Sequence, residues 1–66
     1  MNNTEVQRSG HVKIVRITDL DPLATDDQLK AIGLAAAYET PQSVWGVRVE
    51  RFPLTPDVVH VHISLD

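Results

Sequence analysis

The feature that most constrains the fold is the run VVHVHISL over residues 58–65, in which apolar and polar side chains alternate. Successive side chains of a strand point to opposite faces of a sheet, so this period of two predicts a half-buried strand. One face needs a hydrophobic layer over it, while the other presents His60 and His62 to solvent or to a ligand. The apolar face consists of Val59, Val61, Ile63 and Leu65.

Two earlier runs also have the composition of strands. The run HVKIVRIT over residues 11–18 is rich in β-branched residues, and VWGVRVERF over residues 44–52 alternates in polarity. The short connector PLTPD before residue 58 predicts that the last two strands form a hairpin.

One helix is predicted between the first two of these strands. Thr25 and Gln28 have the spacing of a capping box, so the helix should begin at Asp26 and end by Tyr38. An alternative is a short helix that ends at Gly33 as its C-terminal cap, followed by a second turn.

The resulting order, β-α-β-β, predicts an α+β domain over residues 11–66, with one helix packed on a three-stranded sheet. A right-handed crossover makes the first two strands parallel, so a mainly antiparallel sheet has the order 1-3-2, with the last strand in the centre. The polar residues 1–10 are expected to be a flexible tail. Besides the apolar face of the last strand, the predicted core is Val15, Ile17, Leu20, Leu29, Ile32, Ala36, Trp45, Val47 and Val49.

The size of the chain favours self-association. With 66 residues and no cysteine, a disulfide framework and thiolate zinc sites are excluded. A core of this size rarely contributes more than about 3–5 kcal/mol, so small domains often rely on an oligomer. We therefore expect a homodimer, through apolar residues that one helix on three strands leaves uncovered: Val12, Ile14, Leu34 and Tyr38.

Composition also limits the compartment and the partners. No apolar run approaches the roughly 18–20 residues of a membrane span, and the N-terminus lacks an apolar signal region, so a cytoplasmic protein without membrane contact is expected. Nine acidic and six basic residues give a net charge of −3, which disfavours binding to nucleic acid.

Two surfaces are candidates for binding. The first is the open sheet face, where symmetric pairing of the last hairpin places Glu50 opposite His60 and Arg48 opposite His62, with Arg16 on the flanking strand. The second is the acidic rim at the start of the helix, which comprises Asp19, Asp21, Asp26 and Asp27.

Catalytic and metal motifs are not recognised. His60 and His62 could be two metal ligands, but zinc sites use three or four and no third ligand is obvious. The acidic rim resembles a calcium loop only in its charge, because the central glycine and the closing glutamate are missing. Since no nucleophile and base have a recognisable spacing, we expect a protein that is not an enzyme and has no cofactor.

The stretch VRITDLDPLATDDQLKAIG resembles the first strand and helix of an RNA-recognition motif, in which an Asn-Leu-Pro-like turn leads into an acidic-capped helix. The β-α-β-β order is similar as well. The resemblance implies RNA binding on the open sheet face, where aromatic residues of that family stack bases. The matching positions here are Arg16, His60 and His62, none of which is Phe or Tyr.

Two functional hypotheses follow. The first is a small acidic protein-binding module, an inhibitor or adaptor of the kind that phages and mobile elements encode, including anti-CRISPR proteins, which acts on a larger nucleic-acid-handling protein. Its acidic rim would complement a basic channel of that partner. The second is a minimal nucleic-acid binder that uses the open sheet face.

Overall fold

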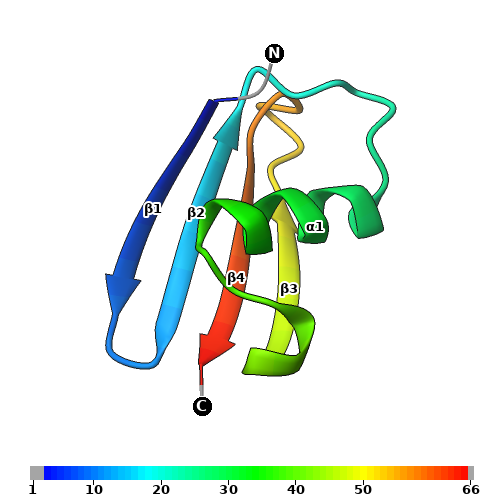
Figure 1. The fold of residues 1–66 in the computed structure, drawn as a ribbon. Coiled ribbons are helices and arrows are strands. Elements are labelled where there is room, and N and C mark those ends of the chain that lie inside the picture. The colour runs from blue at the N-terminus through cyan, green and yellow to red at the C-terminus, as the bar shows by residue number, and fades with distance from the viewer. Residues whose placement is uncertain (1–2, 66) are drawn as a thin grey trace.

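The computed structural model describes residues 3–65 and has the element order ββαββ (Figure 1). Its four strands form one antiparallel sheet in the order β1-β2-β4-β3, and the helix lies across one face of it. The predicted α+β class is confirmed. The elements are β1 (Asn3–Ser9), β2 (Val12–Thr18), α1 (Asp26–Ala36), the short 3-10 helix η1 (Pro41–Ser43), β3 (Val44–Arg51) and β4 (Val59–Leu65).

The prediction of three strands in the order 1-3-2 is wrong, because the sheet has a fourth strand, β1. The segment expected to be a flexible tail forms this strand over residues 3–9, while residues 1–2 lie outside the described part. Every β1 side chain is exposed, so the strand is held mainly by backbone pairing with β2 and carries no apolar period. The last strand, β4, does lie between β2 and β3, as the crossover and the antiparallel pairing predicted.

The turn between β1 and β2 explains how the polar segment becomes a strand. Ser9 pairs with Val12, so the loop is the two residues Gly10 and His11. Gly10 has a φ of +60° at the first position of the loop, the conformation that a tight hairpin turn requires and that glycine adopts without strain.

The helix begins as predicted. Thr25 Oγ1 accepts a hydrogen bond from the Gln28 backbone N–H at 3.2 Å, and Gln28 Oε1 accepts one from the Thr25 N–H at 2.9 Å. These two bonds complete the capping box. The helix continues through Gly33 to Ala36, so the alternative of a helix ending at Gly33 is wrong.

Gly33 lets the helix approach the central strand closely. A Cβ atom placed on Gly33 would lie 2.7 Å from Val61 Cγ1 and 2.8 Å from Val61 Cβ, closer than such atoms pack. The absent side chain therefore determines how near α1 can lie to β4.

The C-terminal end of the helix is tied to β2. The backbone N–H groups of Tyr38 and Glu39 donate to the carbonyls of Ala35 and Leu34, the bond pattern of a Schellman motif, with Tyr38 in the left-handed region at φ 56°. Lys13 Nζ donates to the Ala37 carbonyl at 2.8 Å and to Glu39 Oε1 at 2.9 Å. The hydrogen bond from Lys13 lowers the pKa of the Glu39 carboxyl, and a second one from Ser43 adds to the effect.

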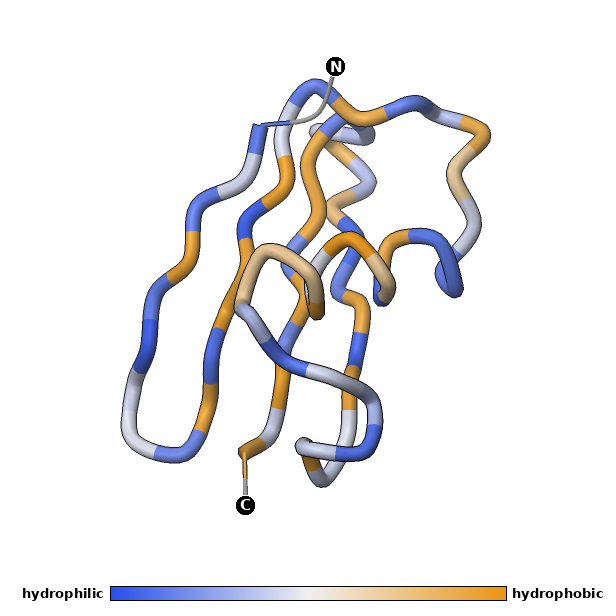
Figure 2. The backbone as a smooth tube through the Cα atoms, viewed as in Figure 1, coloured by the Kyte–Doolittle hydropathy of each residue, from blue (hydrophilic) through white to orange (hydrophobic). Residues whose placement is uncertain are grey.

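The core is one apolar layer between α1 and the sheet, and Figure 2 shows the apolar residues alternating along the central strands. Trp45, predicted to lie in the core, is 77% exposed. A bulge between Val44 and Gly46 inserts Trp45 as an extra residue, so Val44 takes the inward position opposite Leu65. The buried side chains are Val15, Ile17, Leu20, Leu29, Leu34, Ala37, Val59, Val61 and Ile63.

Ile32, Ala36, Val47, Val49 and Leu65 are only partly buried but pack against this core, in agreement with the sequence pattern. In residues 3–65 no helix combines the length and apolarity needed to cross a bilayer.

Candidate functional site

The sheet face that points away from α1 is covered by no other described element, and we call it the open face. The predicted pairing of the last hairpin is confirmed, with Glu50 opposite His60 and Arg48 opposite His62. On the other side of β4, Arg16 lies opposite His60 and Ile14 opposite His62. Adding the edge strand, the two rows in the middle of the open face are Glu5, Arg16, His60 and Glu50, and Gln7, Ile14, His62 and Arg48.

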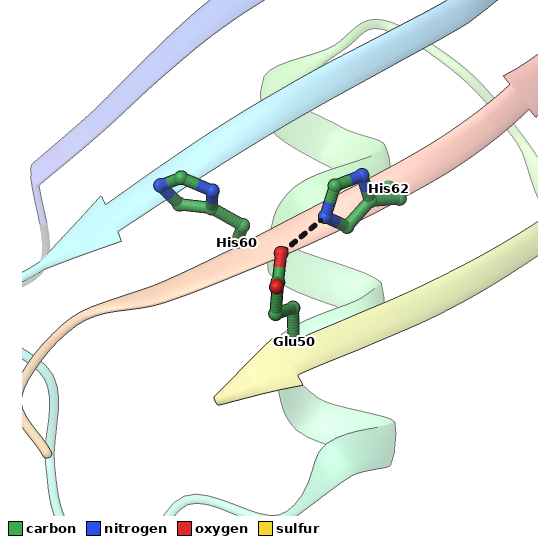
Figure 3. Close-up of side chains that lie close together, drawn as sticks. All are labelled: Glu50, His60 and His62. Carbon is green, nitrogen blue, oxygen red and sulfur yellow. Dashed lines mark hydrogen bonds and ion pairs between the residues drawn. The ribbon is translucent and has the colours of Figure 1, made fainter. Parts of the chain in front are cut away.

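Three of these side chains converge in the middle of the open face (Figure 3). His60 and His62 project from β4 on the same side, and Glu50 reaches them from β3. Glu50 Oε1 lies 2.8 Å from His62 Nε2, although Glu50 is directly opposite His60 in the sheet. An ionised carboxylate can only accept, so the His62 Nε2–H donates this hydrogen bond.

The bond has an electrostatic consequence for Glu50. The hydrogen bond from His62 lowers the pKa of the Glu50 carboxyl, and the positive charge of Arg48 acts in the same direction. Partial burial opposes both effects. Glu50 is therefore held in its ionised form, with its side chain 42% exposed and that of His62 19% exposed.

His60 is positioned by an aromatic neighbour. The ring of Phe52 meets the His60 ring edge to face, with 4.8 Å between the ring centroids. The two imidazole rings are 6.2 Å apart. Beside His62, a shallow hollow is lined by Val12, Gly46, Val47, Arg48, His62 and Ser64.

The three side chains offer a possible set of metal ligands. One donor atom each from Glu50, His60 and His62 lies within 4.8 Å of the other two, and all three residues are partly buried. The sequence indicated the two histidines but no third ligand. The predicted register already placed Glu50 beside them; what it did not reveal is that the carboxylate crosses diagonally to His62.

The acidic rim does not join this site. Arg51 donates to Asp26 and to the Ala24 carbonyl on the helix side of the sheet. Asp21 Oδ1 accepts the Leu23 backbone N–H at 2.9 Å. Asp19 adopts a left-handed φ of 57°, and Asp27 is exposed in the first turn of α1. At least two of the four rim carboxylates therefore serve the fold itself.

The four residues predicted as an oligomer contact do not form one patch. Leu34 is only 7% exposed and belongs to the core, because the buried side of α1 includes Leu34 together with Leu29 and Gly33; this prediction is wrong. Tyr38 is 95% exposed but lies beyond the end of α1, in the helix layer. Val12 and Ile14 are half-buried on the open face.

The fold and the open face define a small ββαββ α+β protein with an uncovered sheet surface. Comparison of the chain with protein-family models, with curated proteins and with solved structures finds no match. The element order also differs from the one on which the resemblance to an RNA-recognition motif was based, because two strands precede the helix instead of one.

Proposed function

We propose that this chain is a small non-enzymatic protein-binding module that contacts a larger protein through the open face. The observation that carries the proposal is the sheet itself, which is covered by a helix on one side only. The uncovered side carries apolar, aromatic and charged groups, the mixture found in protein interfaces. A role as inhibitor or adaptor of a nucleic-acid-handling protein from a phage or mobile element remains the finer form of this proposal.

The hollow beside His62 is the best place for a partner side chain to insert. Val12 provides apolar surface there, and Arg48 can pair with an acidic group at the edge of the partner. The hollow exists because Gly46 has no side chain: a Cβ atom added there would meet nothing within 4 Å. We therefore propose a protein partner that inserts an apolar side chain flanked by an acidic one.

The same glycine supplies a clean test. Gly46→Val should fold normally, because the added side chain enters open space on a strand, and should block the hollow. The control is the double variant Asp19→Asn/Asp27→Asn on the acidic rim. We expect a protein captured by the wild type from lysate, and then purified, to bind Gly46→Val at least about tenfold more weakly and the rim variant unchanged. Loss of binding in the rim variant alone would move the interface to the acidic rim.

A second candidate, single-stranded nucleic acid, is supported by the stacking-capable pair Phe52 and His60, which lies beside Arg16. This candidate requires binding that weakens steeply as salt is raised. A gel shift with single-stranded oligonucleotides across a salt series distinguishes the two, because the protein-binding proposal predicts no shift even at low salt.

We also propose that the chain forms a homodimer. Its contact residues would be Val12 and Ile14 on the open face, or Tyr38 on the helix side. Sedimentation at micromolar concentration tests it directly: a 7.3 kDa species would exclude the dimer.

A further inference from the structure

We infer that Glu50, His60 and His62 form a binding site for a divalent transition-metal ion of the zinc type. The proposal goes beyond the protein-binding function and does not depend on it. It rests on the convergence of two imidazoles and one carboxylate from adjacent strands, with donor atoms no more than 4.8 Å apart.

The distances are close to those that a metal requires. A tetrahedral zinc ion with bonds of about 2.0–2.2 Å holds its ligand atoms about 3.3–3.6 Å apart. The Glu50 and His62 atoms, at 2.8 Å, must separate slightly, while the widest pair in the cluster, within 4.8 Å, must close by about 1 Å or slightly more. Side-chain rotation can make both changes, since the residues lie on the paired strands β4 and β3 and only their side chains have to move.

The donor set indicates which ions fit. Two imidazole nitrogens and one carboxylate oxygen suit zinc, copper and nickel, whereas magnesium and calcium prefer sites built from oxygen alone. Glu50 supplies one negative charge, and a metal bound at His62 Nε2 would replace the hydrogen bond that this nitrogen donates to Glu50, with the remaining imidazole proton on Nδ1. Three protein ligands leave a fourth position for water or for a partner's side chain.

Two positively charged arginine side chains near the site oppose the binding of a cation. Arg48 lies opposite His62 and acts electrostatically on Glu50, and Arg16 lies opposite His60. Both guanidinium groups repel a cation, so they weaken its binding. Removing one of them should therefore tighten binding, which loss of folding could not imitate.

The test is calorimetric titration of tag-free protein with Zn²⁺, with Mg²⁺ as the control ion. We expect one Zn²⁺ per chain, and binding weakened at least about tenfold in each of Glu50→Gln, His60→Gln and His62→Gln. The matched control is His11→Gln, which removes the third histidine of the chain, in the β1–β2 turn, and should bind as the wild type does. Arg48→Gln should bind about two- to fivefold more tightly.

Several outcomes would overturn the inference: wild-type affinity for Zn²⁺ weaker than about 1 mM, equal binding of Mg²⁺, or loss of binding in His11→Gln. Amide NMR spectra establish which variants are folded. Should the ligand variants fail to fold, the wild-type affinity, the ion control and the His11 and Arg48 variants still decide the question.

Discussion

Replacing Gly33 by alanine tests how α1 is seated on the sheet. At an ordinary helix position this change stabilises a protein by about 0.5–1 kcal/mol, because alanine loses less conformational freedom. Here the new Cβ would lie 2.7 Å from Val61 Cγ1 and 2.8 Å from Val61 Cβ, on a fully buried residue of the central strand. Overpacking of this kind costs about 1–3 kcal/mol. Since Val61 cannot rotate its Cβ away, we expect a net loss of about 1–2 kcal/mol.

Thermal unfolding measures the effect. A loss of this size lowers the melting temperature by about 4–16 °C in a domain of this length. Ala31→Gly and Ala35→Gly, at exposed positions of α1, calibrate the intrinsic difference between the two residues. In the background of Val61→Ala, the cost of Gly33→Ala should fall by at least about 0.5 kcal/mol, because two of the three close contacts are removed. A Gly33→Ala variant as stable as the wild type would refute the close packing of α1 on β4.

Three further predictions follow from particular residues. Tyr38 is exposed and holds a left-handed φ, so Tyr38→Gly should stabilise the fold by about 1 kcal/mol in urea unfolding while Tyr38→Ala should not. The pKa of Glu39 is lowered in the folded chain, so the ionised Glu39 carboxylate stabilises the fold above the ordinary carboxyl pKa, and this stabilisation is lost as pH falls through the lowered pKa. Glu39→Gln should flatten this part of the curve of unfolding free energy against pH. The same slope in Glu39→Gln as in the wild type would contradict the Lys13 contact. The fluorescence of Trp45, the one tryptophan of the chain, should be quenched by acrylamide in the folded state nearly as well as in urea, and a protected, blue-shifted emission would place Trp45 in the core after all.

Local patterns in the sequence predicted much of this fold. The capping box at Thr25, the alternation in β4 and the hairpin of β3 and β4 each depend on one continuous segment of the sequence. Alternation also predicted which face of β4 lies under the helix.

The predictions for β1 and Trp45 were wrong because backbone pairing, and not the pattern of apolar side chains, determines the structure there. The strand β1 has no apolar period because none of its side chains is buried, and Gly10 at the start of a two-residue loop was its one local signal. The bulge at Trp45 shifts the inward position by one residue and cannot be recognised from alternation alone. Leu34 was predicted on the uncovered side of the helix because Ile32 and Ala36 were assigned to the inward face, whereas the fully buried side of α1 includes Leu34.

The candidate site was half predictable. The spacing of His60 and His62 and their pairing with β3 placed the right residues near each other. The choice of partner for Glu50 depends on side-chain conformation, which the sequence pattern does not determine. The diagonal contact with His62, rather than the direct cross-strand contact with His60, is what brings three donors together.

The metal site is tested most directly by a long-range ¹H–¹⁵N NMR spectrum of the imidazole groups, recorded on tag-free protein before and after addition of Zn²⁺. The chain has three histidines, and only two of them lie on the open face beside Glu50. We expect the ring-nitrogen signals of His60 and His62 to shift together and saturate with one equivalent, while those of His11 stay in place. A shift of His11, or of none of the three, would contradict a metal site at the centre of the open face.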